Sequence, residues 1–187
     1  MTSGSRPLPR SQRQTRCILA GVVIAGLAAL AWATFGASSP RLVYNPSDSV
    51  PVGWYAVHPF ARGTHAISVG SVVLAWLPHG ATVLAARRDY LPRQVPLLKP
   101  VAAVAPETVC VTGGVVRIDG RPVAAVLSVD GRGRPLHAWN HCRRLHAGEL
   151  FLLSTSNPAS YDSRYFGPVR TSSVLGSAHP IWLGKQP

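Results

Sequence analysis

The hydrophobic and polar positions of this 187-residue chain follow two patterns. Cys17 to Gly36 form one apolar run of twenty residues without a charge, and about 20 apolar residues suffice for a helix to span a membrane. After this run, short apolar stretches alternate with Gly, Pro and Asp-Gly breaks, a pattern typical of strands and tight turns. The pattern therefore predicts a long N-terminal helix followed by a mostly antiparallel, partly closed β domain.

Individual strands and turns are predicted within that β domain. We expect a second, short helix from Ala81 to Arg88. The expected strands and hairpins are 68–76 with a bend at Gly70, 95–104, a hairpin over 115–123 that turns at Asp119-Gly120, a second hairpin over 126–136 that turns at Asp130-Gly131, and 149–154.

The charge distribution gives the apolar run a direction. The first sixteen residues hold four Arg and no acidic residue, so the positive-inside rule keeps this tail (1–16) cytoplasmic. The run 17–36 is then a single transmembrane anchor in contact with lipid, and residues 37–187 form an exported domain. The alternative is a cleaved secretory signal with the A-x-A-like site Ala31-Trp32-Ala33, and it exports the same domain.

Several other classes of protein are not favoured. The formal charge of +12 suits an anionic partner, but the Arg residues are scattered without a nucleic-acid-binding pattern, so we expect no nucleic acid. His137 and His141 are four apart, as metal ligands on a helix would be, and His146 is near. Because Pro135 and nearby turn residues oppose a helix, we expect no metal there. The chain also has no Gly-rich phosphate-binding loop, so we expect no cofactor.

Two cysteines lie in the predicted exported region, where disulfides persist. Cys110 and Cys142 are therefore a candidate disulfide with a structural role, since the chain has no C-x-x-C motif. Cys17 lies at the predicted membrane boundary.

The first segment that can carry chemistry is Tyr44-Asn-Pro-Ser-Asp-Ser-Val-Pro-Val-Gly-Trp-Tyr55. Its Pro and Gly residues predict a stiff turn that presents a hydroxyl, and both Ser47 and Ser49 are available. A plain capped turn is the alternative.

The second segment is Val95-Pro-Leu-Leu-Lys-Pro-Val-Ala-Ala-Val104, in which one Lys interrupts an apolar run. On a strand, Lys99 shares a face with Val95, Leu97 and Val101. Seventeen of the nineteen cations in this chain are Arg, yet this one is Lys. Unlike Arg, a buried Lys can lose its proton and act as a general base. The alternative is an outward Lys on an edge strand that ends at Pro100.

The third segment, Leu153-Ser-Thr-Ser-Asn-Pro-Ala-Ser-Tyr-Asp-Ser-Arg-Tyr-Phe-Gly-Pro168, is rich in hydroxyls. Asp162 and Arg164 are two residues apart, which places them on one face if the segment is an extended strand. The alternative is a polar loop with a surface ion pair, which stabilises by only about 0–1 kcal/mol.

Together these segments resemble the signal peptidase I family of membrane-anchored serine–lysine peptidases, and especially its TraF-type conjugative-transfer branch. Asn45 to Tyr55 resembles the nucleophile box, with Ser49 as nucleophile, and Leu97 to Ala103 resembles the box of the general-base lysine, with Lys99. Ser160 to Pro168 is similar to the Asp-Ser-Arg-Tyr-aromatic-Gly box. The stretch Ser154-Thr-Ser-Asn157 departs from the Gly-Asp-Asn-Arg of bacterial signal peptidases, and Val50 departs from their Met.

The resemblance implies a signal-peptidase-like β domain behind the anchor, on the periplasmic side of a bacterial inner membrane. It implies a serine endopeptidase that processes exported protein precursors such as a conjugative pilin, by hydrolysis or by transpeptidation to a cyclic product. Ser49 would be the nucleophile and Lys99 the base, with Asp162, Arg164, Ser160 and Ser47 in support and the Ser49 N–H as oxyanion donor. The alternatives are a general signal peptidase and a non-catalytic anchored part of a pilus or secretion apparatus.

Overall fold

The computed structural model describes residues 10–35, 41–60 and 67–184. The chain divides into two compact units, Met1–Ser39 and Pro40–Pro187. In the first unit, α1 extends over Arg10–Phe35 and so includes the predicted apolar run except Gly36, which lies outside the described residues. Within the described ranges, no helix meets the combined length and hydropathy expected of a membrane span. The transmembrane anchor therefore stays a prediction.

The second unit is mainly β, as predicted, and its sheets are antiparallel throughout. Its elements are β1 (Arg41–Asn45), β2 (Gly53–His58), β3 (Val72–Ala75), α2 (His79–Arg87), β4 (Leu97–Val104), β5 (Thr108–Thr112), β6 (Val115–Ile118), β7 (Arg121–Ala125), β8 (Cys142–Arg144), β9 (Glu149–Leu152), α3 (Ser163–Phe166), β10 (Val169–Arg170), the 3-10 turn Thr171–Ser173 and β11 (Val174–Leu183).

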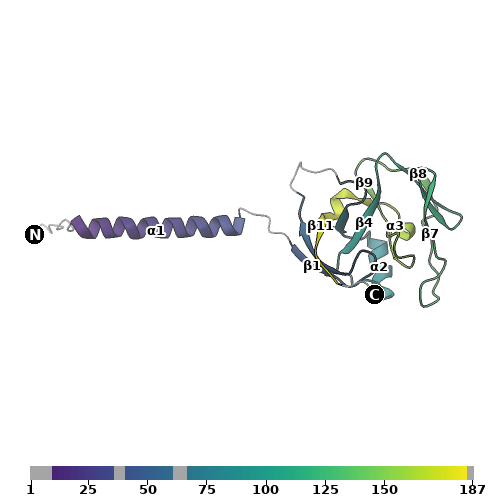
Figure 1. Ribbon diagram of the computed structural model, residues 1–187, viewed down its shortest axis with the longest axis horizontal. Helices are drawn as coiled ribbons and strands as arrows, with labels where there is room; N and C mark the ends of the chain where they lie inside the picture. Colours follow the sequence, from purple (N-terminus) through teal and green to yellow (C-terminus); the bar gives the residue numbers. More distant parts are fainter. Residues whose placement is uncertain (1–9, 36–40, 61–66, 185–187) are drawn as a thin grey trace, which may run out of the picture. The chain divides into compact units, whose positions relative to one another are not determined.

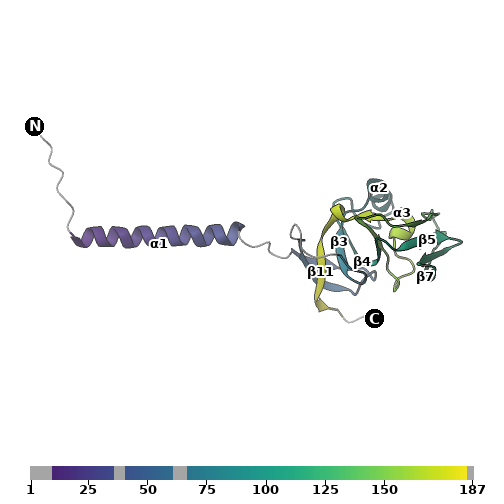
Figure 2. The same cartoon turned by 90° about the horizontal axis from the view of Figure 1, so that it is seen from above.

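These strands form two sheets. The larger sheet has the order β1-β2-β11-β3-β4-β9-β10, and the smaller has the order β7-β6-β5-β8. Figures 1 and 2 show the smaller sheet at the opposite end of this unit from β1 and β11. The strand that follows all others in the chain, β11, begins at Val174 and yet lies between β2 and β3, which end at His58 and Ala75.

The larger sheet is curled. Neighbouring strands lie about 4.8 Å apart, so a flat sheet would hold β2 and β4 well out of side-chain contact, with β11 and β3 between them. Instead Tyr55 and Val57 of β2 share one buried cluster with Leu98 of β4 and Ala178 of β11. Gly176 permits the close approach of β11 to β2, because a Cβ atom there would collide with the carbonyl of His58. The curl brings the first and middle strands of the sheet to one apolar interior.

The turn residues explain which predicted hairpin forms. Asp119 and Gly120 both have positive φ (47° and 78°), as the two-residue turn between β6 and β7 requires. The predicted hairpin over 126–136 forms only as a short fold-back without named strands: Val129 and Pro135 make an isolated antiparallel bridge, flanked by the backbone hydrogen bonds from Asp130 N–H to the Arg134 carbonyl and from Leu136 N–H to the Ser128 carbonyl. The reason is that the Asp130 carboxylate accepts hydrogen bonds from two backbone N–H groups of its own segment and so closes a loop.

Candidate active site

The Ser49 turn joins β1 to β2 and is held from within by one amide side chain. Asn45, the last residue of β1, is 5% exposed, and its Nδ2 donates to the carbonyl oxygens of Ser47 (2.7 Å), Val50 (3.0 Å) and Pro51 (3.2 Å). Its Oδ1 accepts from the N–H (3.2 Å) and the hydroxyl (2.8 Å) of Ser47. Sequence reasoning assigned Asn45 no role, although an Asn before Pro-Ser is a known signal for a side-chain-closed turn.

The same turn is anchored to the interior of the sheet. Val50 is buried beside Leu98, and the Tyr55 hydroxyl donates to the Pro51 carbonyl at 2.7 Å. Burial raises the pKa of Tyr55, so its hydroxyl keeps the proton that it donates there. Ser49 therefore sits on a turn whose two ends are both fixed.

Lys99 lies on β4, which is a central strand between β3 and β9. Its side chain is 2% exposed, so the alternative of an outward Lys on an edge strand is wrong. Pro100 does not end the strand, which continues to Val104. Val95 was expected on the same strand face as Lys99, but β4 starts only at Leu97 and the Val95 side chain is exposed.

The amine of Lys99 meets two serine hydroxyl groups. Its Nζ donates short hydrogen bonds to Ser49 Oγ and to Ser160 Oγ, and the two hydroxyl oxygens are 3.3 Å apart. All three residues are buried. The fold thus brings together three predicted site residues that are 50 and 61 positions apart in the chain.

The protonation of Lys99 is shifted by its surroundings. Burial is the largest influence and lowers the pKa of the Lys99 amine from 10.5 to about 8, while Asp162 raises it and Arg164 lowers it. About one molecule in ten therefore carries the neutral amine at pH 7, and the neutral amine is the form that can accept a proton.

This pKa gives a prediction for any reaction that uses Lys99 as a base. We expect kcat/KM to rise with pH through a midpoint near 8 and then to level off, because the free amine replaces the ammonium over that range. The measurement is the initial cleavage rate of a peptide substrate from pH 6 to 10. A rate that stays flat across this range would exclude a base titrating at Lys99.

A fully buried ion pair lies behind the loop that carries Ser160. Asp162 and Arg164 are both 0% exposed, with Arg164 Nε and Nη2 2.8 and 3.0 Å from the two carboxylate oxygens. The expected extended strand and the surface ion pair are both wrong. Asp162 instead caps α3 by accepting the N–H of Arg164, so the chain turns into a helix at this point.

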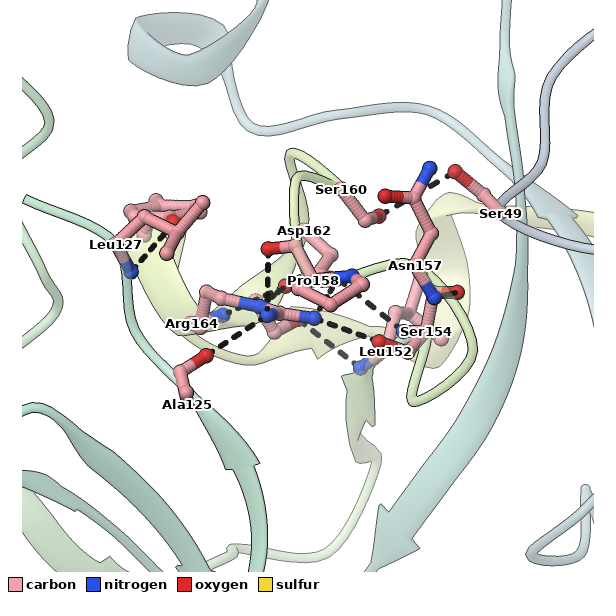
Figure 3. A network of polar contacts seen from close by, with 12 residues as sticks. Ser49, Ala125, Leu127, Leu152, Ser154, Asn157, Pro158, Ser160, Asp162 and Arg164 are labelled. Carbon is pink, nitrogen blue, oxygen red and sulfur yellow. Dashed lines mark hydrogen bonds and ion pairs between the residues drawn. The ribbon is translucent and has the colours of Figure 1, made fainter. Parts of the chain in front are cut away.

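Arg164 also fixes the course of the loop. Its guanidinium donates to the carbonyl oxygens of Ser154 (2.6 Å), Pro158 (3.1 Å) and Ala125 (2.9 Å), as Figure 3 shows. Asp162 accepts the N–H of Ser154 at 3.2 Å. The ion pair therefore ties down the loop that leads to Ser160, without itself contacting Ser49.

A cleft of about 470 Å³ opens at the Lys99 amine, and apolar side chains such as Leu74 and Leu98 cover much of its wall. Ser49, Lys99 and Ser160 all line it. Sequence reasoning missed a polar cluster at its wall, in which Asp130 accepts from the Tyr90 hydroxyl and pairs with Arg88 and Arg134. No short motif joins these residues, so nothing in the chain marked them.

The remaining predicted residues lie apart from Lys99. Ser47 also lines the cleft, but its hydroxyl donates to Asn45 and not toward Lys99. Cys110 and Cys142 are joined by a disulfide between β5 and β8 of the smaller sheet.

The histidines near Cys142 have local partners. His137 and His141 lie in a segment without helix, and His141 Nδ1 contacts the carbonyl of Trp139. His146 Nδ1 is 3.4 Å from the Glu149 carboxylate.

Comparison with known proteins identifies the family of this chain. The family described as "Signal peptidase, peptidase S26" matches residues 14–183. "Plasmid transfer protein TraF" of Escherichia coli is 32% identical over 176 residues, which cover 88% of this chain and 94% of that protein. "Conjugal transfer protein TraF" of Agrobacterium tumefaciens (strain 15955) is 36% identical over 151 residues, 76% of this chain and 81% of its own length.

Among solved structures, a signal peptidase I from Enterococcus faecalis V583 aligns with a TM-score of 0.37 and 18% identity, over 62% of this chain and 98% of its own. The assignment rests instead on the family match, which spans nearly all of the chain, and on the two transfer proteins. The resemblance noted in the three sequence boxes is confirmed. This chain belongs to the signal peptidase family of S26 peptidases.

Proposed function

We propose that the protein is a serine endopeptidase in which Ser49 is the nucleophile and Lys99 the general base. The observation that carries the proposal is the contact of Lys99 Nζ with Ser49 Oγ in the cleft. The family supplies the expectation of a protein substrate. The lowered pKa of Lys99 makes a free amine available where the hydroxyl proton must go.

The proposed reaction has two stages. The neutral Lys99 amine accepts the proton of Ser49 as its Oγ attacks the scissile carbonyl, and the resulting ammonium returns that proton to the leaving amine. Water then attacks the Ser49 ester while Lys99 takes one of its protons. The tetrahedral intermediate expels Ser49 Oγ, which recovers that proton from the Lys99 ammonium, and the acid product leaves and loses its own proton to solvent. Ser160, which contacts both groups, keeps the amine directed at Ser49.

The substrate that we propose is an exported precursor of a conjugation apparatus, such as a pilin. The support is the likeness to two proteins named for plasmid or conjugal transfer. An amine of the product could replace water in the second stage and give a cyclic chain, since both nucleophiles attack the same ester. A general signal peptidase would instead accept ordinary secretory precursors.

The test is processing of a co-expressed pilin precursor by the wild type and by the Ser49→Ala and Lys99→Arg variants. We expect a shortened or cyclised product, distinguished by mass, with the wild type only, because Arg keeps the charge but cannot act as a base. The exposed Ser172→Ala is the matched control and should leave processing unchanged.

Each other outcome has a meaning of its own. Processing that survives in Lys99→Arg would rule out the proposed base. Cleavage of secretory precursors but not of the pilin would indicate the general peptidase. No processing by the folded wild type would favour a non-catalytic component of the apparatus.

We also propose that α1 anchors the protein in the inner membrane, with the peptidase unit on the periplasmic side. The uncharged run from Cys17 and the four Arg before it support this, as do the exposed large apolar side chains of α1. We expect the full chain to stay in the membrane pellet after an alkaline carbonate wash. Release into the supernatant, or a mature N-terminus near Ala33, would contradict an uncleaved anchor.

A further inference from the structure

The cleft has a second wall that carries none of the proposed catalytic groups. It is built from Tyr90 after α2, Asp130 and Leu136 between β7 and β8, and Tyr161. The ring centroids of Tyr90 and Tyr161 are 5.3 Å apart. Tyr161 directly follows Ser160, whose hydroxyl contacts both proposed catalytic side chains. The second wall therefore begins next to the site of cleavage.

Four side chains join the two segments that build this wall, and we call them the Asp130 cluster: Arg88, Tyr90, Asp130 and Arg134. From one segment to the other, the Tyr90 hydroxyl donates to Asp130 Oδ2, and Arg88 Nη2 donates to a backbone carbonyl at 2.9 Å. In the opposite direction, Arg134 Nη2 donates to the carbonyl of Arg88 at 3.1 Å. Between β7 and β8, strand pairing in the described chain is limited to one isolated bridge. The cluster therefore sets the position of this segment against Tyr90.

The polar atoms of Asp130 are occupied within the protein. Its Oδ1 accepts two backbone N–H groups of its own segment, both at 2.9 Å, and its Oδ2 accepts the Tyr90 hydroxyl and Arg134 Nε, the latter at 2.7 Å. Four hydrogen bonds fill the acceptor sites of a carboxylate, and the Asp130 side chain is 6% exposed, so it offers no site for a substrate cation. The surface left for a ligand consists mainly of the rings of Tyr90 and Tyr161 and the side chain of Leu136, which suits an apolar group.

We propose that the second wall is a substrate subsite that binds an apolar side chain of the precursor, and that Asp130 is the positioning residue of this subsite. The subsite is distinct from the position of the scissile bond, because within the described residues no member of the Asp130 cluster is hydrogen-bonded to Ser49 or Lys99. The proposal rests on the proposed function, since its occupant is the chain that Ser49 cleaves. Both regions line one continuous cleft, so an extended chain bound at Ser49 reaches the wall. Because the cluster holds Tyr90 in place beforehand, binding there requires little ordering.

The deciding variant is Asp130→Asn in the full chain. Asparagine is almost the same size and keeps one oxygen for the two N–H groups of its own segment. It replaces the other oxygen by an NH₂ group, which cannot accept the Tyr90 hydroxyl or Arg134 Nε. The variant therefore breaks contacts between the two segments and spares the local turn.

The substrates are peptides that span the pilin processing site and are shortened one residue at a time from either end. With the wild type, we expect KM to rise about 10-fold at a single step of shortening, where the apolar residue bound at the wall is lost. With Asp130→Asn, we expect the longest peptide to have a KM about 10-fold higher already, with kcat retained, and the step to disappear.

Asp89→Asn is the matched control, because it removes a carboxylate from an exposed ion pair with Arg132 between the same two segments, and the step should remain. Tyr90→Phe removes only the hydroxyl that Asp130 accepts and should raise KM for the long peptides alone. If circular dichroism shows that Asp130→Asn is unfolded, Tyr90→Phe decides. A step that survives, a rise in KM that is equal for the longest and shortest peptides, or a fall in kcat without a rise in KM would overturn the proposal.

Binding of the same peptides to Ser49→Ala, measured by fluorescence anisotropy, separates the subsite from the proposed function. If the wild type is as inactive as Ser49→Ala, the proposed function fails. The subsite is then supported by a single step in affinity that Asp130→Asn removes, and it is overturned by affinities that do not depend on Asp130.

Discussion

Replacing Lys99 by Met will abolish cleavage and yet stabilise the protein at neutral pH. The pKa of the Lys99 amine is lowered from 10.5 to about 8, so at pH 7 most molecules hold a buried ammonium at a cost of about 3 kcal/mol. Methionine has a similar shape and no charge. The variant loses the two hydrogen bonds to Ser49 and Ser160, each of which stabilises the fold by about 1 kcal/mol. Removal of the buried charge outweighs this loss, so the free energy of unfolding should rise by about 1 kcal/mol.

The pH dependence of the free energy of unfolding tests whether the buried Lys99 ammonium causes this stability difference. Because the pKa of Lys99 is lower in the folded state, the unfolded chain binds more protons between pH 8 and 10.5. The free energy of unfolding of the wild type therefore rises through this window, while Lys99→Met lacks this contribution. Denaturant titrations of both proteins at pH 7 and 10 should show their difference moving by about 2 kcal/mol in favour of the wild type. A difference that is the same at both pH values would mean that Lys99 is not titrating with a lowered pKa.

Removal of Arg164 will have the largest effect on stability. In Arg164→Met, the Asp162 carboxylate remains buried without its partner, and three carbonyl oxygens lose their donor. Breaking a buried pair from one side costs about 3–5 kcal/mol, which for a chain of this size lowers the melting temperature by about 10 °C. Thermal unfolding followed by circular dichroism measures the change.

The double variant Asp162→Asn, Arg164→Met tests whether the unpaired Asp162 carboxylate causes the stability loss of Arg164→Met. We expect it to recover at least about 1 kcal/mol relative to Arg164→Met alone, because no carboxylate is then buried without a cation. If the double variant is less stable than Arg164→Met, the cost lies in the lost carbonyl contacts. The exposed pair Arg132 and Asp89 is the matched comparison, and Arg132→Met should change stability little.

The two catalytic candidates could be found in the sequence for different reasons. Lys99 was visible because it is a rare Lys within an apolar run, and a buried strand is what such a run forms. Ser49 needed the family resemblance, since composition does not separate it from Ser47. The geometry now separates them, as only Ser49 contacts Lys99.

Other features depended on contacts that no local pattern records. Asp162 and Arg164 have the spacing of a surface pair, and their burial follows from the backbone carbonyls of segments that fold around them. The strand β11 shows no apolar alternation, because its second half is exposed. Asn45 acts through five local hydrogen bonds that the sequence shows only as an Asn before Pro.

The position of β11 also sets the order of events during synthesis. The Ser49 turn belongs to β1 and β2, whereas Lys99 belongs to β4, and β11 is the strand that joins these two groups in the sheet. A ribosome therefore makes Ser49 and Lys99 long before it makes the strand that brings them together. Such long-range pairing is slow to form. With the roles that we propose for Ser49 and Lys99, a nascent chain will be inert toward neighbouring chains until β11 has emerged and docked, so that protein synthesis itself delays the onset of the proposed activity.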